Sequence, residues 1–227
     1  MPGRGAVQKR YNIADAEEHD MAFGDFKYPA VVGSLGLTER TLPNLFADVP
    51  LVQPSALLLN CLGINIPLAT GAHSESARIT WLVGPVLSDL WARYDGRLSV
   101  NPGVEFEADP AAKLTGYCDF IVSRGPQRPV IGPPVLLIFE AKRDSIPDGL
   151  GQCIAGMVGA QRYNQRNNTP VDPVYGCVTT GSLWKFLRLS GTVLTNDLTE
   201  HALTQADRLL GILTHIVGPP PAQPAAA

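Results

Sequence analysis

The amino-acid sequence predicts an α/β sandwich in which helices cover a central mixed β-sheet. Three observations support this: a helical pattern over 75–93, two short apolar runs of strand character at 117–122 and 135–139, and a second helical pattern over 148–166. Further apolar runs follow the second helix, as expected when a helix forms a crossover connection between strands. The predicted order is a helix, three strands, a crossover helix, two strands and a closing helix.

Length and composition fit one main domain with extensions. The chain has 227 residues, of which 45% are hydrophobic, and this is enough to bury one good core. Prolines at positions 29, 43, 50, 54 and 67 predict short helices and extended segments in the first third of the chain. We divide the chain into a flexible N-terminal arm (1–25), a helical and extended N-terminal extension (26–73), a main domain (74–217) and a disordered Pro/Ala tail (218–227).

The first helix of the main domain is predicted over 75–93, because its apolar residues share one face and Ser74 is placed as its N-cap. Glu75 then lies in the first turn, where a carboxylate interacts favourably with the helix dipole. A supporting contact to a metal ion or to water is the functional alternative for Glu75. Gly84 and Pro85 predict a bend or a lost hydrogen bond inside this helix.

Three strands in an antiparallel meander are predicted over 98–107, 114–122 and 135–142. The third strand is nearly all aliphatic, as is typical of a strand covered on both faces, and it ends in Glu140-Ala141-Lys142. Side chains alternate along a strand, so Glu140 and Lys142 should point to the same face. Asp119 interrupts the second strand.

The crossover helix is predicted to begin with Asp148 as its N-cap and to run to about Arg166. It carries several glycines, which ordinarily weaken a helix, so we expect it to pack very closely against the sheet. Gln152 lies about one turn beyond the cap, where it can approach Lys142; a position on the surface is the alternative.

Two more strands and a helix close the predicted domain. The apolar runs 174–179 and 183–189 are joined by Thr180-Gly181-Ser182, which is typical of a hairpin. An amphipathic helix is predicted over 197–217.

Asp119, Glu140 and Lys142 together indicate metal-dependent chemistry on a phosphate. Two carboxylates supply the hard oxygen ligands that Mg²⁺ or Mn²⁺ prefers, and such an ion makes water a usable nucleophile near neutral pH. Lys142 can orient that water or neutralise charge that develops on the phosphate. An isolated Glu-x-Lys triplet is most simply a pair of solvated residues at a strand end. Its combination with Asp119 favours phosphodiester cleavage.

The order of these residues resembles the PD-(D/E)XK nuclease superfamily of restriction-endonuclease-like folds. The resemblance covers roughly residues 74–189, and Cys118 stands where the motif has its proline. The short motif is degenerate, so its specificity depends on order and context. The matching residues, in the order of the superfamily's helix, second strand, third strand and following helix, are Glu75, Asp119, Glu140, Lys142 and Gln152.

The resemblance implies a restriction-endonuclease-like α/β sandwich and a Mg²⁺-dependent endonuclease, with DNA preferred over RNA and a role in defence against foreign DNA. Asp119, Glu140 and Glu75 would serve as metal ligands, and Gln152 would lie near Lys142 or the attacking water. One alternative is a nuclease-fold module that has lost catalysis and binds nucleic acid or a protein partner. Another is an unrelated interaction protein in which the motif is accidental.

Charge and cysteine content constrain the partners. The formal net charge is −3, whereas a protein that held nucleic acid by its overall field would usually be basic. We therefore expect a local basic patch or a groove formed by a homodimer or larger oligomer, with the segment before Glu75 and the closing helix as contacts. The four cysteines are scattered in apolar contexts and predict buried thiols, not a zinc site. No signal peptide or membrane-spanning run is evident, so a cytoplasmic protein without a membrane partner is expected.

Overall fold

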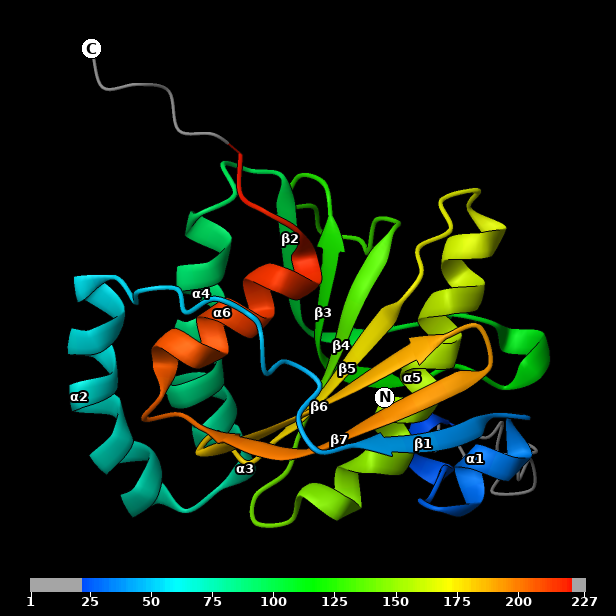
Figure 1. The fold of residues 1–227 in the computed structure, drawn as a ribbon, viewed down its shortest axis with the longest axis horizontal. Helices are drawn as coiled ribbons and strands as arrows, with labels where there is room; N and C mark the ends of the chain where they lie inside the picture. The colour runs from blue at the N-terminus through cyan, green and yellow to red at the C-terminus, as the bar shows by residue number, and fades with distance from the viewer. Residues whose placement is uncertain (1–21, 222–227) are drawn as a thin grey trace, which may run out of the picture.

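A computed structural model describes residues 22–221, and within them the chain forms one seven-stranded mixed sheet (Figure 1). The strand order is β1-β7-β6-β5-β4-β3-β2. The β4–β5 and β1–β7 pairs are parallel and the others are antiparallel, which confirms the predicted α/β class. The strands are β1 (Thr38–Leu42), β2 (Leu98–Glu105), β3 (Tyr117–Arg124), β4 (Val135–Ala141), β5 (Val174–Thr179), β6 (Leu183–Ser190) and β7 (Val193–Ala202).

Helices cover both faces of the sheet. One face packs on α5, with η1 and α1 beside it, whereas α4 and α6 cover the other face and α2 lies outside α4 at the edge of the molecule (Figure 1). The helices are η1 (Phe23–Asp25), α1 (Ala30–Ser34), α2 (Ala56–Ala72), α3 (Glu75–Arg78), η2 (Ile79–Val83), α4 (Gly84–Ala92), η3 (Pro110–Ala112), α5 (Ile146–Arg166) and α6 (Ala206–Val217).

The hydrophobic core has two layers because strand side chains alternate between the two faces. On the α5 side, Ile138 and Val178 of the sheet pack in one apolar cluster with Ile154 of the helix. On the α6 side, Phe139 meets Trp184 edge to face, with ring centroids 5.7 Å apart. Neighbouring residues of β4 therefore serve opposite layers, and the whole strand is buried, as its aliphatic sequence predicts.

The predicted helix over 75–93 consists of α3, the π-helical η2 and α4 in succession. Ser74 is the N-cap, as predicted, and its hydroxyl accepts a hydrogen bond from the Ala77 N–H at 3.2 Å. Pro85 has no N–H to donate to the carbonyl of Trp81, four residues earlier. The Asn65 side chain of α2 donates to that carbonyl instead, at 2.9 Å. The predicted break at Pro85 is thus a widened helical turn just before the proline. The hydrogen bond that the proline cannot make is replaced by one from α2.

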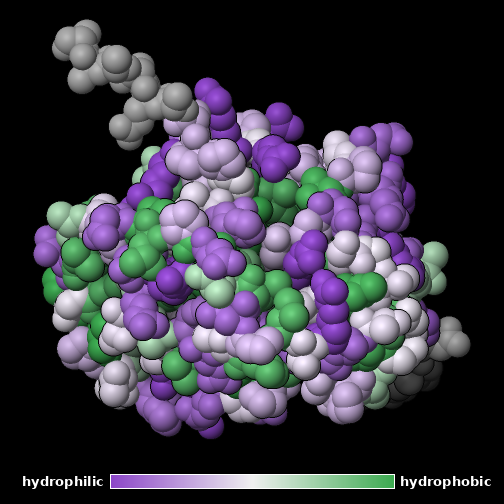
Figure 2. Space-filling view, viewed as in Figure 1, coloured by the Kyte–Doolittle hydropathy of each residue, from purple (hydrophilic) through white to green (hydrophobic). Residues whose placement is uncertain are grey.

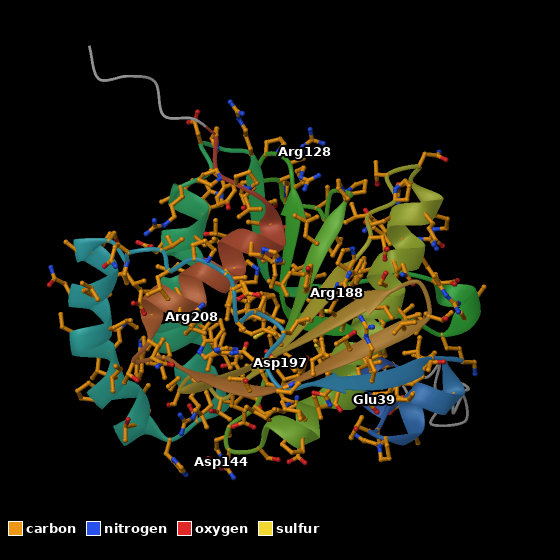
Figure 3. All side chains as sticks on the ribbon, in the orientation of Figure 1. Glu39, Arg128, Asp144, Arg188, Asp197 and Arg208 are labelled. Carbon is orange, nitrogen blue, oxygen red and sulfur yellow. The ribbon has the colours of Figure 1, made fainter. Side chains whose placement is uncertain are left out.

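The predicted closing helix over 197–217 is wrong in its first part. Residues 193–202 form β7, and α6 begins only at Ala206. Asp197, at the centre of Figure 3, is fully buried in β7, where its main-chain carbonyl accepts a hydrogen bond from Lys185 Nζ at 2.6 Å. Arg40 of β1 donates to the buried Thr195 hydroxyl at 2.9 Å. The Asp197 carboxylate itself is bonded within β7, to the Thr199 N–H at 3.0 Å and to the His201 ring at 3.5 Å. Such partners allow polar residues in a buried strand.

The N-terminal segments are more closely tied to the domain than predicted. The arm was expected to include residues 1–25, but Phe23 is fully buried and its N–H donates to the Thr115 carbonyl at 2.7 Å. The extension over 26–73 contributes β1 to the sheet, so it is not separate from the main domain. The rest of the predicted arm and most of the predicted tail lie outside the described residues.

The predicted close packing of the crossover helix is confirmed, although α5 begins at Ile146, with Ser145 and not Asp148 at its N-cap. A Cβ atom added at Gly151 would lie 2.2 Å from the carbonyl oxygen of Phe26. One added at Gly159 would lie 2.8 Å from the Ala108 Cβ. These glycines let the segments that flank α5 approach its backbone.

Gly151→Ala should therefore lower stability, because the contacting atoms at Phe26 are backbone and cannot turn aside. Overpacking of this kind costs about 1–3 kcal/mol, which corresponds to roughly 2–4 °C in Tm per kcal/mol for a chain of this size. Gly33→Ala in α1 is the matched control, since a Cβ atom there meets nothing within 4 Å. Calorimetry of both variants checks the prediction, and equal Tm values for them would contradict it.

Candidate active site

The candidate site lies where β3 and β4 separate. The two strands pair through Ile121–Ile138 and Phe120–Phe139, and the ladder ends there. Asp119, the next residue toward the start of β3, accepts a hydrogen bond through Oδ2 from the Ala141 N–H at 2.6 Å. A side-chain oxygen thus replaces the missing ladder carbonyl and fixes the carboxylate beside the end of β4.

Glu140 and Lys142 share one face at this end of β4, as the sequence predicts. Lys142 Nζ forms an ion pair with Glu140 Oε1. Glu140 is only 2% exposed, whereas Lys142 extends into a half-buried position. β4 pairs on its other side with β5, where Val178 lies opposite Glu140, so the acidic residue is enclosed by apolar sheet.

A glycine of α5 makes room for this ion pair. A Cβ atom at Gly149 would lie 3.2 Å from Cγ of Glu140, 3.3 Å from Cγ of Lys142 and 2.6 Å from Cγ1 of Val178. The first turn of α5 therefore presents bare backbone to the candidate catalytic side chains. A larger residue here would have to displace Val178 from the core or push the helix outward.

The electrostatics of the site leave negative charge incompletely balanced. Burial, followed by the nearby Asp119 charge, raises the pKa of Glu140 to about 8 against the opposing effect of Lys142. Burial also raises the pKa of Asp119, although the Ala141 hydrogen bond and Lys142 oppose this. Burial alone would lower the pKa of Lys142, but its hydrogen bond to Glu140 and the surrounding carboxylates raise it. Lys142 is therefore cationic at neutral pH.

Glu75 lies near the site but is not part of a preassembled ligand group. It lines a cavity of about 470 Å³ together with Lys142 and Asp148. Its charge contributes to the raised pKa values of Asp119 and Glu140. Across residues 22–221, however, no group of three or more His, Cys, Asp or Glu residues has the geometry of a metal site. Direct ligation by Glu75 stays a prediction.

The chemistry of Asp119 and Glu140 fits a site with two carboxylate ligands. Each has one oxygen in a hydrogen bond, and the other oxygen has no hydrogen-bond partner within residues 22–221. Mg²⁺ commonly takes one or two carboxylates, keeps several waters and completes its shell with substrate phosphates. A divalent cation would also offset the negative charge that raises the pKa of Glu140. The residues present therefore fit Mg²⁺ or Mn²⁺.

Gln152 contacts the strand that carries Asp119, not Lys142. Its Nε2 donates to the carbonyl oxygen of Tyr117 at 3.1 Å, two residues before Asp119. Within the described chain it has no hydrogen bond to Lys142. This bond ties Gln152 to the start of β3, and its predicted contact with the attacking water stays a prediction.

Two arginines that sequence reasoning missed lie beside the site. Arg78 and Arg143 line a second cavity of about 400 Å³, which shares Arg143, Asp144 and Ser145 with the cavity at Glu75 and Lys142. Arg78 is held by a hydrogen bond from Nη1 to the Thr180 carbonyl at 3.1 Å. The available signal was spacing, since Arg78 lies about one turn after Glu75 and Arg143 directly follows Lys142.

Two other arginines, Arg162 and Arg128, lie away from the site. Arg162, near the end of α5, forms an ion pair with Asp109 at 2.8 Å. Arg128 lies at the top of the molecule in Figure 3, at the opposite end from Asp144, which marks the loop beside the candidate site. Neither arginine is placed to assist Lys142.

No protein-family model matches this sequence, and no curated protein matches it either. Among residues 22–221 there is also no helix with the length and apolar character needed to cross a membrane. The functional argument therefore depends on the geometry of the site.

The raised pKa of Glu140 predicts a pH-dependent stability for the metal-free protein. A raised pKa in the folded state means that folding favours the protonated form of Glu140. Its contribution to stability is therefore fully present below the ordinary pKa of 4.5 and is lost as pH rises through about 8. Glu140→Gln cannot ionise, so in chelator its Tm should exceed that of wild type by a few degrees at pH 9 but not at pH 5.

Calorimetric scans across this pH range check the prediction. Glu105→Gln is the control, because Glu105 is exposed on β2 and its carboxylate remains hydrated after folding. If the Tm of wild type instead rises relative to that of Glu140→Gln as pH increases, the prediction is wrong. Lys142 would then stabilise the Glu140 carboxylate by more than burial destabilises it.

Proposed function

We propose that the protein is a metal-dependent endonuclease of the PD-(D/E)XK type that hydrolyses phosphodiester bonds, with DNA preferred over RNA. The observation that carries this proposal is the meeting of Asp119, Glu140 and Lys142 at the point where β3 and β4 separate. The order of α3 to α4, β2, β3, β4, α5 and β5 supports a restriction-endonuclease-like arrangement. A role in defence against foreign DNA is part of the same proposal.

Each residue has a distinct task in the proposed reaction. Asp119 and Glu140 would hold Mg²⁺, which when bound polarises the phosphate and lowers the pKa of water. Lys142 is held beside Glu140 as a cation, from which it can donate a hydrogen bond to the attacking water or to a phosphate oxygen. The buried, apolar surroundings of Glu140 strengthen these interactions by excluding bulk water.

Arg78 and Arg143 would bind the phosphates next to the scissile bond. Contacts with phosphates position a nucleic acid without reading its sequence. The two arginines adjoin the Lys142 cavity and would add positive charge beside Lys142, with Arg143 held in an ion pair with Asp144 at 2.6 Å.

A nuclease-fold module without catalytic activity is the second candidate. It is favoured by the Glu140–Lys142 ion pair, which occupies one ligand oxygen, and by the lack of a preassembled three-residue metal group among residues 22–221. Calorimetric titration with Mg²⁺ and Mn²⁺ separates the two candidates. Binding that Asp119→Ala abolishes supports the nuclease, and nucleic-acid binding without metal binding supports the second candidate.

Wild-type protein should cut plasmid DNA with Mg²⁺ or Mn²⁺ and lose this activity in chelator. Asp119→Ala, Glu140→Ala and Lys142→Ala should each reduce the rate by at least about a hundredfold, as expected when a group that stabilises the transition state is removed. Glu105→Gln, which removes an exposed carboxylate of β2, should retain the wild-type rate. Gel electrophoresis of plasmid and of RNA under the same conditions measures both the rate and the substrate preference.

Cleavage by a folded Asp119→Ala variant at the wild-type rate would exclude Asp119 as a metal ligand. Circular dichroism of each variant shows whether a loss of activity reflects chemistry or unfolding. A wild-type protein that shifts DNA in a gel without cutting it would favour the binding module.

Arg143→Ala should weaken DNA binding and reduce the salt dependence of the affinity by about one phosphate contact. Arg128→Ala is the matched control, because Arg128 is also an exposed arginine but lies at the opposite end of the molecule (Figure 3). Fluorescence anisotropy with a labelled duplex over a range of salt concentrations measures both effects. Equal effects of the two substitutions would show that binding depends on overall charge and not on the site.

A further inference from the structure

Helix α2 exposes an unusual amount of apolar surface. Twelve of its seventeen residues are exposed, and Figure 2 shows hydrophobic residues gathered at the left edge of the molecule, where α2 lies. A helix that is hydrophobic all round is normally buried, and a contiguous exposed apolar patch marks an interaction surface. The exposed large side chains of α2 are Leu57 (73%), Leu59 (55%), Ile64 (66%), Ile66 (40%) and Leu68 (48%).

The helix is attached to the domain by one narrow stripe and presents a shallow groove on its opposite side. The stripe that packs on α3, η2 and α4 consists of Leu58, Leu62, Asn65 and Ala69. At 3.6 residues per turn, a stripe of mostly small, exposed residues faces away from the domain. This outward stripe consists of Ala56, Asn60, Gly63, Pro67 and Gly71.

Two apolar ridges border the outward stripe. Leu57, Ile64 and Leu68 recur on one side of it, and Leu59 and Ile66 on the other. A Cβ atom added at Gly63 or Gly71 would meet nothing within 4 Å, so the groove is open. Small residues between larger ones allow another helix to approach closely and to place its own side chains in the groove.

We propose that a second copy of this chain covers α2, so that two copies pair through their α2 helices about a twofold axis near Gly63. In such an interface the same patch meets itself, and a charged patch would repel its own copy. No Asp, Glu, Lys or Arg occurs between residues 49 and 74. The ridges and groove of α2 are also complementary in shape, since each ridge can enter the groove of the partner helix.

The surface available for pairing continues from α2 onto α4. A hollow of about 860 Å³ lies between α2 and α4, lined in part by Leu57, Cys61 and Pro85. Trp91 of α4 is also exposed, and it lines a neighbouring cavity that shares Gly84 and Ser88 with this hollow. A standard interface buries roughly 800 Å² per partner, and the exposed ridge side chains of α2 and the rim of this hollow are the surface that the pairing would bury.

The other possible occupants fit α2 less well. A helix that lies on a membrane surface carries Lys and Arg beside its apolar face, and α2 has neither. The N-terminal segment joins the described chain at Ala22, which pairs with Thr115 on the α5 side of the sheet, away from α2. Residues 222–227 consist of Ala, Pro and Gln, which supply little apolar area.

Analytical ultracentrifugation of the full chain tests the proposal without reference to nuclease activity. Wild-type protein should sediment as a dimer at micromolar concentration, and Ile64→Glu and Ile64→Lys should each sediment as single chains. An equimolar mixture of these two variants should regain the dimer, because their opposite charges face each other only if α2 packs against α2. Val130→Glu is the matched control, since Val130 is 67% exposed and lies outside α2, and it should remain a dimer.

Gly63→Leu separates pairing from folding. Leucine is the better helix former and has open space at this position, so the Tm of the monomeric domain should stay the same or rise. The same side chain would fill the groove at the twofold axis and abolish the dimer. Circular dichroism confirms that each variant is folded before its mass is compared.

Three results would overturn the proposal. The first is a wild-type protein that sediments as a single chain throughout the micromolar range. The second is a dimer that persists in Ile64→Glu, or a mixture of the Glu and Lys variants that stays monomeric. The third is a monomer that floats with phosphatidylcholine vesicles through α2, which would show that a lipid surface is the occupant.

Discussion

The hydrogen bond from the Ala141 N–H to the Asp119 carboxylate determines how this end of the sheet is built. A buried N–H at the end of β4 must be bonded, and the part of β3 that precedes Phe120 no longer pairs with β4 and supplies no main-chain carbonyl. Because a side chain provides the acceptor, the two strands can diverge without leaving the donor unsatisfied. The same bond orients Asp119 and leaves its second oxygen available, so strand separation and ligand placement have one cause.

The site combines features that a purely structural strand end would avoid. Glu140 continues an apolar strand and is buried beneath α5, which makes its negative charge costly. The ion pair with Lys142 offsets only part of the free energy needed to bury this charge. Position 149 is a glycine, so no side chain packs there and the Glu140–Lys142 pair has room. Residues held against their local preferences are typical of functional sites, because their arrangement is maintained by the surrounding fold.

The parts of the fold that the sequence predicts are those with a strong local pattern. The aliphatic run of β4 and the alternation of strand side chains place Glu140 and Lys142 together, and Ser74 marks a helix start. β1 was missed because its sequence, Thr-Glu-Arg-Thr-Leu, has no apolar alternation at an exposed edge. The sequence predicts a helix from residue 197 onward, whereas polar side chains at the centre of β7 bond to β1, as Thr195 does to Arg40 and Asn196 to Glu39, and partners so distant in the chain leave no local pattern. The sequence allows Gln152 to approach Lys142, whereas its observed partner is the main-chain carbonyl of Tyr117, and a main-chain partner leaves no signal in the sequence.

The parallel pairing of β1 with β7 also affects the order in which the molecule can assemble. Thr38 lies opposite Val193, so the two strands are separated by most of the chain. During synthesis β1 leaves the ribosome long before its partner exists, and contacts between such distant segments form late because the intervening loop must first be closed. β2, β3, β4 and the crossover helix can meanwhile form from neighbouring segments. The first strand to be synthesised is therefore expected to be the last to join the sheet.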